Sequence, residues 1–260
     1  MFKKIVIGVV VLAVLGGAGL LVLDRTIFAP VAVSESVPVA PTLVAPTVAV
    51  PTSTAAQPAA TTAVASNAAS TTSSASTDST AAQVYKIDAS QSEVSYEVGE
   101  TFFNQNNRFN TAIGRTKGIA GEILVNFDQP AQSQIGSIVI DVSQFTSDES
   151  RRDNFIRRTG LESATYPQAT FKTTSITGLP DKVAVGDQLS LTITGDLTVK
   201  QTTHPVTWNM TLKVGDNQLT GSASTQIKMS DFGVGPLQLP ILQTQDDIKL
   251  SFDFVAVRAS

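Results

Sequence analysis

Few residues in this chain could act as nucleophiles, general bases or metal ligands. The 260 residues include one histidine, His204, and no cysteine, so a Ser-His-Asp triad or an ordinary zinc site can hardly be assembled. His204 falls in a predicted turn before a proline, where we expect it to be exposed and inert. The acid pairs Asp246-Asp247 and Asp148-Glu149 are typical of turns and helix starts. The sequence therefore predicts no catalytic residue, no metal site and no cofactor.

One predicted short helix carries arginines that could bind an anion. Ser147 can cap its first turn, which is acidic, and Gly160 follows its last turn. Arg151 and Arg158 share one face by their spacing. Two interpretations stay open. The arginines are either solvated and paired with neighbouring acids, or they form a cationic rim that holds the phosphate head group of a ligand.

Overall charge and cysteine content exclude several classes of protein. The formal net charge is −4, which gives no basic footprint for nucleic acid. Without cysteine, disulfides, thiol catalysis and Cys-ligated metals are impossible. The composition also shifts along the chain, and this divides it into three parts.

The first part, residues 1–25, is predicted to be a transmembrane anchor. Lys3 and Lys4 precede an uncharged apolar run from Ile5 to Leu23, whose roughly 19 residues would span about 28 Å as a helix. The two lysines place the N-terminus in the cytoplasm and the C-terminal domain outside it, in the periplasm or beyond the cell. A cleaved signal peptide is the alternative, although residues 29–32 make a poor cleavage site.

The second part, residues 26–82, consists mainly of Pro, Ala, Thr, Ser and Val with almost no charge. Such a stretch buries too little apolar surface to offset the entropy lost on ordering. We therefore expect a disordered linker between the anchor and the folded domain.

The third part, residues 83–258, alternates apolar and polar residues in many short runs separated by turns. In the clearest pair of runs, Leu191 and Ile193 alternate with polar residues before a turn, and Trp208 and Met210 alternate after it. Gly195 interrupts the first run, where a bulge or a close backbone approach is expected. Many strands and one short helix predict an all-β antiparallel sandwich or barrel.

Three sequence blocks in this domain resemble the YceI-like family. The first is G-D-L-T-V-K-x-x-T-x-P-V-T-W at 195–208, the second combines Arg152-Asp153 with Y-P-Q-A-T-F-K at 166–172, and the third is S-D-F-G at 230–233. The resemblance implies an exported, lipocalin-like barrel of eight antiparallel strands that binds polyisoprenoids. The expected partner is an isoprenoid lipid, such as a polyprenyl phosphate or an isoprenoid quinone.

The candidate ligand-binding residues lie on the inward alternation of the predicted strands. Two interpretations stay open, a solid core that these residues fill and a lumen that they line, because periodicity reports burial and not empty space. The resemblance favours the lumen, as an apolar tunnel around an isoprenoid chain. The candidates are Tyr96, Ile140, Phe171, Ile193, Trp208, Met210, Phe252 and Phe254.

Two further segments, 100–110 and 236–242, are unusually apolar for loops and are candidates for a rim, a lid or a membrane contact. Two other functions remain open. One is a stress-protection or interaction module on a membrane stalk, which a fully packed interior would favour. The other is a hydrolase or isomerase based on Asp and Glu, which a buried carboxylate at the mouth of the tunnel would favour.

Overall fold

The computed structural model describes residues 31–43 and 82–259, and its regular structure is almost entirely β. One α-helix, α2 (Ser150–Phe155), runs into a wider helical turn, η4 (Ile156–Gly160). Short 3₁₀ turns are η1 (Phe103–Gln105), η2 (Pro130–Gln132), η3 (Val142–Gln144) and η5 (Ser230–Phe232). The strands are β1 (Ala82–Ile87), β2 (Glu93–Phe102), β3 (Arg108–Thr116), β4 (Ile119–Ala120), β5 (Glu122–Asn126), β6 (Gln134–Ile135), β7 (Ile138–Asp141), β8 (Gln168–Thr177), β9 (Gln188–Val199), β10 (Thr202–Val214), β11 (Gln218–Lys228), β12 (Gln238–Leu239) and β13 (Leu242–Arg258).

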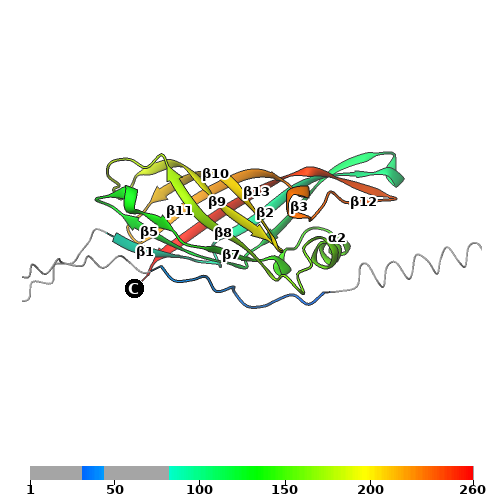
Figure 1. Cartoon of the computed structure of the whole chain (residues 1–260), viewed down its shortest axis with the longest axis horizontal. Coiled ribbons are helices and arrows are strands. Elements are labelled where there is room, and N and C mark those ends of the chain that lie inside the picture. Colours follow the sequence, from blue (N-terminus) through cyan, green and yellow to red (C-terminus); the bar gives the residue numbers. More distant parts are fainter. Residues whose placement is uncertain (1–30, 44–81, 260) are drawn as a thin grey trace, which may run out of the picture.

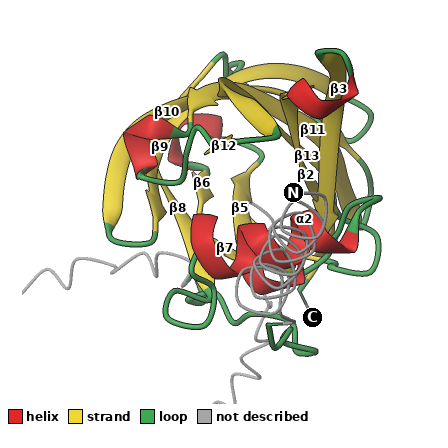
Figure 2. Ribbon diagram, turned by 90° about the vertical axis from the view of Figure 1, so that its right-hand side faces the viewer, coloured by secondary structure: helices red, strands yellow, loops and turns green. Residues whose placement is uncertain are grey.

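All of these strands belong to one antiparallel sheet that curls around an apolar interior (Figures 1 and 2). The hydrogen-bonded order runs β4-β7-β8-β9-β10-β11-β13-β1-β5-β6, while β2 joins β13 to β3. Only Gly121 separates β4 from β5. β4 lies at one end of this order and β5 lies next to the other end, so the two ends of the curled sheet are joined by a nearly continuous stretch of chain.

The all-β antiparallel class is confirmed, but the predicted number of eight strands is wrong, because the sheet has thirteen. The excess comes mainly from interruptions. A turn that begins at Asp88 separates β1 from β2, Lys117 and Gly118 separate β3 from β4, and Gly121 separates β4 from β5. Apolar alternation continues through such breaks in the hydrogen-bond ladder, so the sequence pattern does not report them.

The hairpin of β9 and β10 is confirmed, with Trp208 opposite Ile193 and Met210 opposite Leu191. The strand β8 shifts its register between Thr173 and Ser175, beside Gly195. A Cβ atom at Gly195 would lie 2.4 Å from the backbone oxygen of Lys172. Both the irregularity and the close backbone approach expected at this glycine are therefore present, the irregularity lying in the neighbouring strand.

One end of the curled sheet is tightly packed. Tyr85, Val214, Leu219 and Ala256 are fully buried there, on the successive strands β1, β10, β11 and β13, which the sheet orders as β10-β11-β13-β1. Burial of large apolar side chains is the main stabilising contribution to such a core. The open space described below lies among side chains beyond this packed end.

Residues 31–43, a part of the predicted linker, lie along the outside of the sheet (Figure 1). The Leu43 N–H donates to Glu122 Oε2 at 2.6 Å, the Ser34 N–H donates to Ser143 Oγ at 3.1 Å, and Gln144 Nε2 donates to the Ser36 oxygen at 2.8 Å. The Leu43 side chain also lies against Gly136. This segment therefore has a defined place on the domain, and Ala82, the last residue of the predicted linker, begins β1. The predicted anchor and residues 26–30 and 44–81 of the predicted linker lie outside the described residues.

Replacing residues 31–43 in the full chain by a Gly/Ser segment of equal length is expected to lower the melting temperature. The Gly/Ser segment keeps the backbone groups that make the three hydrogen bonds, but it lacks the buried Pro38 ring and the Leu43 side chain that lies against Gly136. It also loses more conformational entropy when it docks. The expected cost is about 2 kcal/mol, or roughly 4–8 °C for a domain of this size. Calorimetry measures it, and the same replacement at 54–66 serves as control. Equal melting temperatures for the two variants would contradict a stabilising role for this segment.

Within the part of the chain that the structure describes, no helix has both the length and the apolar character needed to cross a bilayer.

Candidate functional site

An elongated apolar cavity lies inside the curled sheet. Its volume is about 200 Å³, which is narrow compared with the roughly 300–1,000 Å³ of common ligand pockets. The side chains that line it are almost all aliphatic or aromatic; Glu100, Arg152 and Thr244 are exceptions. Such a cavity favours an apolar ligand, and a long chain would need the flexible wall side chains to move apart.

The structure places all eight predicted lumen residues on the wall of this cavity. They come from six strands, and their side chains surround the same space: Tyr96, Ile140, Phe171, Ile193, Trp208, Met210, Phe252 and Phe254. The Phe171 and Trp208 rings meet edge to face with centroids 6.1 Å apart, and the Phe252 and Phe254 rings stack at 5.0 Å. Contact of these residues with a ligand remains a prediction.

The indole N–H of Trp208 is buried and makes no hydrogen bond in the described structure. An unpaired buried donor costs free energy, typically about 1–3 kcal/mol. Because Trp208 lines the cavity, a ligand with an acceptor at that depth would satisfy this donor.

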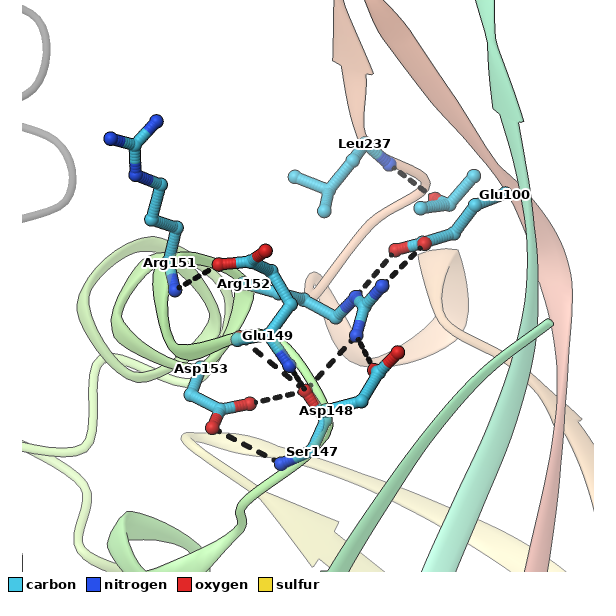
Figure 3. Close-up of polar contacts among 9 residues, drawn as sticks. Glu100, Ser147, Asp148, Glu149, Arg151, Arg152, Asp153 and Leu237 are labelled. Carbon is cyan, nitrogen blue, oxygen red and sulfur yellow. Dashed lines mark hydrogen bonds and ion pairs between the residues drawn. The ribbon is translucent and has the colours of Figure 1, made fainter. Parts of the chain in front are cut away.

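A buried ion pair forms the polar end of the cavity (Figure 3). The Arg152 guanidinium on α2 donates from Nε and Nη2 to the two oxygens of Glu100 on β2, each at 2.9 Å. Glu100 is 2% exposed, and the Arg152 side chain is 11% exposed. Arg152 Nη1 also donates to Ser147 Oγ at 3.0 Å and to Asp148 Oδ1 at 2.5 Å. Paired, planar donors of this kind give strong and geometrically defined contacts.

These contacts shift the pKa values of the groups at the polar end. Burial alone would lower the pKa of Arg152, but the hydrogen bonds and charges of Glu100 and Asp148 outweigh it and raise the pKa. The hydrogen bond from Arg152 lowers the pKa of Asp148. Burial, reinforced by the charge of Asp153, raises the pKa of Tyr96. Tyr96 therefore presents a neutral ring and hydroxyl to the cavity at any ordinary pH.

Arg152, which helical spacing did not single out, is thus the arginine of α2 that lines the cavity. Neither Arg151 nor Arg158 lies on the cavity wall, and Figure 3 shows the Arg151 side chain directed away from Glu100. The inward face of the helix instead carries Arg152, Phe155 and Ile156. The α-helix ends at Phe155 and continues as a wider turn, so regular α-helical spacing does not extend to Arg158.

The start of this helix also differs from the prediction. Glu149 caps it, since its carboxylate accepts from the Arg151 N–H at 3.1 Å. Ser147 lies two residues earlier and donates its hydroxyl to Asp153 at 2.6 Å. The sequence contained one signal for Arg152, because an arginine three residues before a buried aromatic shares its helical face. Its partner Glu100 on β2, however, is 52 residues away in the sequence.

Other chemically capable residues have structural partners. His204 is exposed and meets the Phe232 ring edge on, at 5.4 Å. Asp246 accepts hydrogen bonds from the backbone and hydroxyl of Ser230, which lower its pKa. Among residues 31–43 and 82–259, no three His, Asp or Glu side chains are grouped so that they could hold a metal ion.

A curled antiparallel sheet around an apolar cavity, with a short helix at its polar end, defines a lipocalin-like fold. The model of the YceI-like domain matches residues 85–256, and the chain belongs to this family.

Known relatives agree with this assignment. Protein YceI of Escherichia coli O157:H7 is 30% identical over 165 residues, which cover 60% of this chain and 78% of that protein. A UPF0312 protein of Pseudomonas putida is 30% identical over 131 residues, covering 47% of this chain and 64% of the relative.

Several solved structures have a similar fold, among them the following two. BcnA of Burkholderia cenocepacia superimposes with a TM-score of 0.52 at 25% identity, covering 66% of this chain and 99% of BcnA. A domain of Saccharophagus degradans described as polyisoprenoid-binding and implicated in plant cell wall breakdown gives 0.51 at 14% identity, covering 68% and 99%. The second likeness concerns the fold alone.

Proposed function

We propose that this domain binds an amphiphile with an isoprenoid tail, with the tail in the cavity and the head group beside Glu100 and Arg152. The observation that carries the proposal is the cavity itself, whose wall is apolar along its length and polar at one end. The polyisoprenoid-binding description of the Saccharophagus degradans domain supports the same class of ligand. In this proposal the chain is a binding protein, tethered to the membrane through its N-terminal segment with the domain outside the cytoplasm.

The charges at the polar end favour a neutral head group, such as that of an isoprenoid quinone, over a phosphate. One guanidinium lies between two carboxylates, and three of its nitrogens already donate to Glu100, Ser147 and Asp148. A phosphate at this point would be repelled by the two carboxylates, and the Arg152 nitrogens would already donate to other acceptors. A quinone carbonyl needs only a hydrogen-bond donor, which the Tyr96 hydroxyl near the polar end can supply.

The arrangement of Glu100 gives less support to a hydrolase or isomerase. Glu100 is a buried carboxylate at the cavity, but both of its oxygens accept from Arg152. A general base needs an oxygen directed at the proton that it removes. The open interior also favours ligand binding over a module without a ligand.

The test is a titration followed by the fluorescence of Trp208, the only tryptophan in the chain. A long-tailed quinone is expected to change the emission and to saturate at one molecule per domain. A polyprenyl phosphate with the same tail should bind at least about tenfold more weakly. Equal affinities would refute the choice of head group, and no saturable change with either lipid would refute the proposed function.

A further inference from the structure

Two apolar segments that are far apart in the sequence meet at one end of the molecule. The Phe103 N–H donates to the Ile241 oxygen at 2.9 Å, and Phe102 lies opposite Leu242 in the register of β2 and β13. In Figure 1 the hairpin of β2 and β3 and the hairpin of β12 and β13 project together beyond α2. This places the unusual segments 100–110 and 236–242 side by side.

The projecting end exposes large apolar side chains. Phe103 is 45% exposed, Phe109 is 58% exposed and Ile241 is 52% exposed; we call these three residues the tip. A tight turn at Asn106 and Asn107, both with positive φ, separates the two phenylalanines along the chain. Single exposed apolar residues are common on protein surfaces, but a projecting cluster of them marks a contact site.

The two stretches that form the tip carry a single charge, which is positive. Residues 101–110 and 232–245 contain no acidic residue, and their only charged residue is Arg108; Asp246 and Asp247 follow further along β13. Its guanidinium lies 5.5 Å from the centre of the Phe102 ring, at the base of the tip. Aromatic side chains combined with arginine suit the interface of a bilayer that contains anionic lipids.

The polar end of the cavity lies on the same two hairpins. Glu100, Leu237 and Thr244 line the cavity, and the Leu237 N–H donates to Thr244 Oγ1 at 2.8 Å (Figure 3). Each of these residues is within a few positions of a tip residue. A surface that covers the tip would therefore adjoin the polar end of the cavity.

The size of the tip argues against a second copy of this chain as its partner. The exposed parts of the three side chains amount to roughly 300 Å², since a whole aromatic side chain offers about 150–250 Å². A stable protein interface buries about 800 Å² on each partner. Insertion into lipid needs no matching surface, so three projecting side chains suffice.

We propose that the tip inserts into the interfacial region of a lipid bilayer that carries anionic head groups, and so holds the polar end of the cavity against the membrane. The contact is a second one, separate from the predicted anchor at the N-terminus. It depends on the exposed side chains of the tip and not on what the cavity binds. The membrane contact of the tip can therefore be tested independently of the ligand binding proposed above.

The absence of cysteine from the chain allows single spin labels to test this contact. Phe109→Cys labels the tip, and Val185→Cys is the matched control, because Val185 is also exposed but lies in the loop before β9, beside Val214 at the other end of the sheet. Both full-length variants are reconstituted in vesicles of phosphatidylglycerol and phosphatidylcholine in equal parts. Collision of each label with oxygen, which concentrates in lipid, and with a water-soluble nickel complex is then measured.

The label at 109 is expected to collide more with oxygen and less with nickel than the label at 185, and pure phosphatidylcholine vesicles should weaken this protection. Any anchoring by the N-terminal segment is common to both variants, so it cannot produce the difference. Equal access of nickel to both labels would overturn the proposal. Spin–spin broadening at 109 that disappears on dilution with unlabelled protein would also overturn it, because a second copy would then cover the tip.

A second set of variants tests the side chains themselves. With the label kept at 109, Phe103→Ser and Ile241→Ser should each weaken the protection about tenfold, as expected when a half-exposed apolar side chain is lost from lipid. Val257→Ser removes an exposed apolar side chain at the C-terminal end of β13 and should have no effect. Equal results for the three substitutions would count against insertion of the tip.

Discussion

Replacing Arg152 by methionine is expected to lower the free energy of unfolding by about 3–5 kcal/mol, the usual cost of leaving one member of a buried ion pair without its partner. Glu100 would then be a buried charge with no cation beside it, because both of its oxygens accept from Arg152. For a domain of this size the melting temperature should fall by roughly 10 °C. Thermal unfolding of the full chain measures the effect.

Two further variants separate the buried pair from the exposed one. Combining Arg152→Met with Glu100→Leu removes both charges and should recover most of the lost stability, since apolar replacements of buried pairs are often neutral. Asp148→Asn breaks only the contact of an exposed carboxylate and should cost less than about 1 kcal/mol. If Asp148→Asn lowers the free energy of unfolding as much as Arg152→Met does, the ion pair between Arg152 and Glu100 contributes no more to stability than the exposed contact.

Replacing Met210 by aspartate is expected to abolish the saturable change in Trp208 fluorescence on addition of a long-tailed quinone. Met210 lies on the cavity wall, two residues from Trp208 on the same strand face, and an unpaired carboxylate there would cost several kcal/mol. Binding should weaken by more than about a hundredfold. The adjacent position supplies the control. Thr211 is exposed on the opposite face, where its hydroxyl lies 3.0 Å from that of Ser222, and Thr211→Lys should leave binding intact.

A second variant at the same level of the cavity distinguishes a loss of ligand binding from a loss of folding. Ala223 pairs with Met210 across β10 and β11 and also lines the cavity. Ala223→Leu adds volume to the lumen without charge, so the fold should persist while the tail of the ligand is excluded. Unchanged affinity in both Met210→Asp and Ala223→Leu would show that the lipid binds elsewhere.

The sequence by itself determined the class of the fold and which side chains face inward. Strand alternation is a local property with a period of two residues, so Ile193, Trp208 and Met210 could be assigned to one face before their neighbours were known. Gly195 was likewise recognisable, because a glycine within an alternating run indicates a close approach or a bulge. The family blocks added the curled sheet and the class of ligand that is proposed here.

The tertiary structure decided the features that depend on contacts between residues far apart in the sequence. Glu100 and Arg152 are 52 residues apart, and no local pattern pairs them. The breaks at Gly118 and Gly121 and the docking of residues 31–43 follow from neighbouring strands rather than from the segments themselves. Periodicity also reports that a residue is buried without reporting what lies beyond its side chain. Whether the inward residues meet as a solid core or leave a cavity, and whether two apolar loops join in one tip, is therefore set only when the sheet curls and its strands take their register.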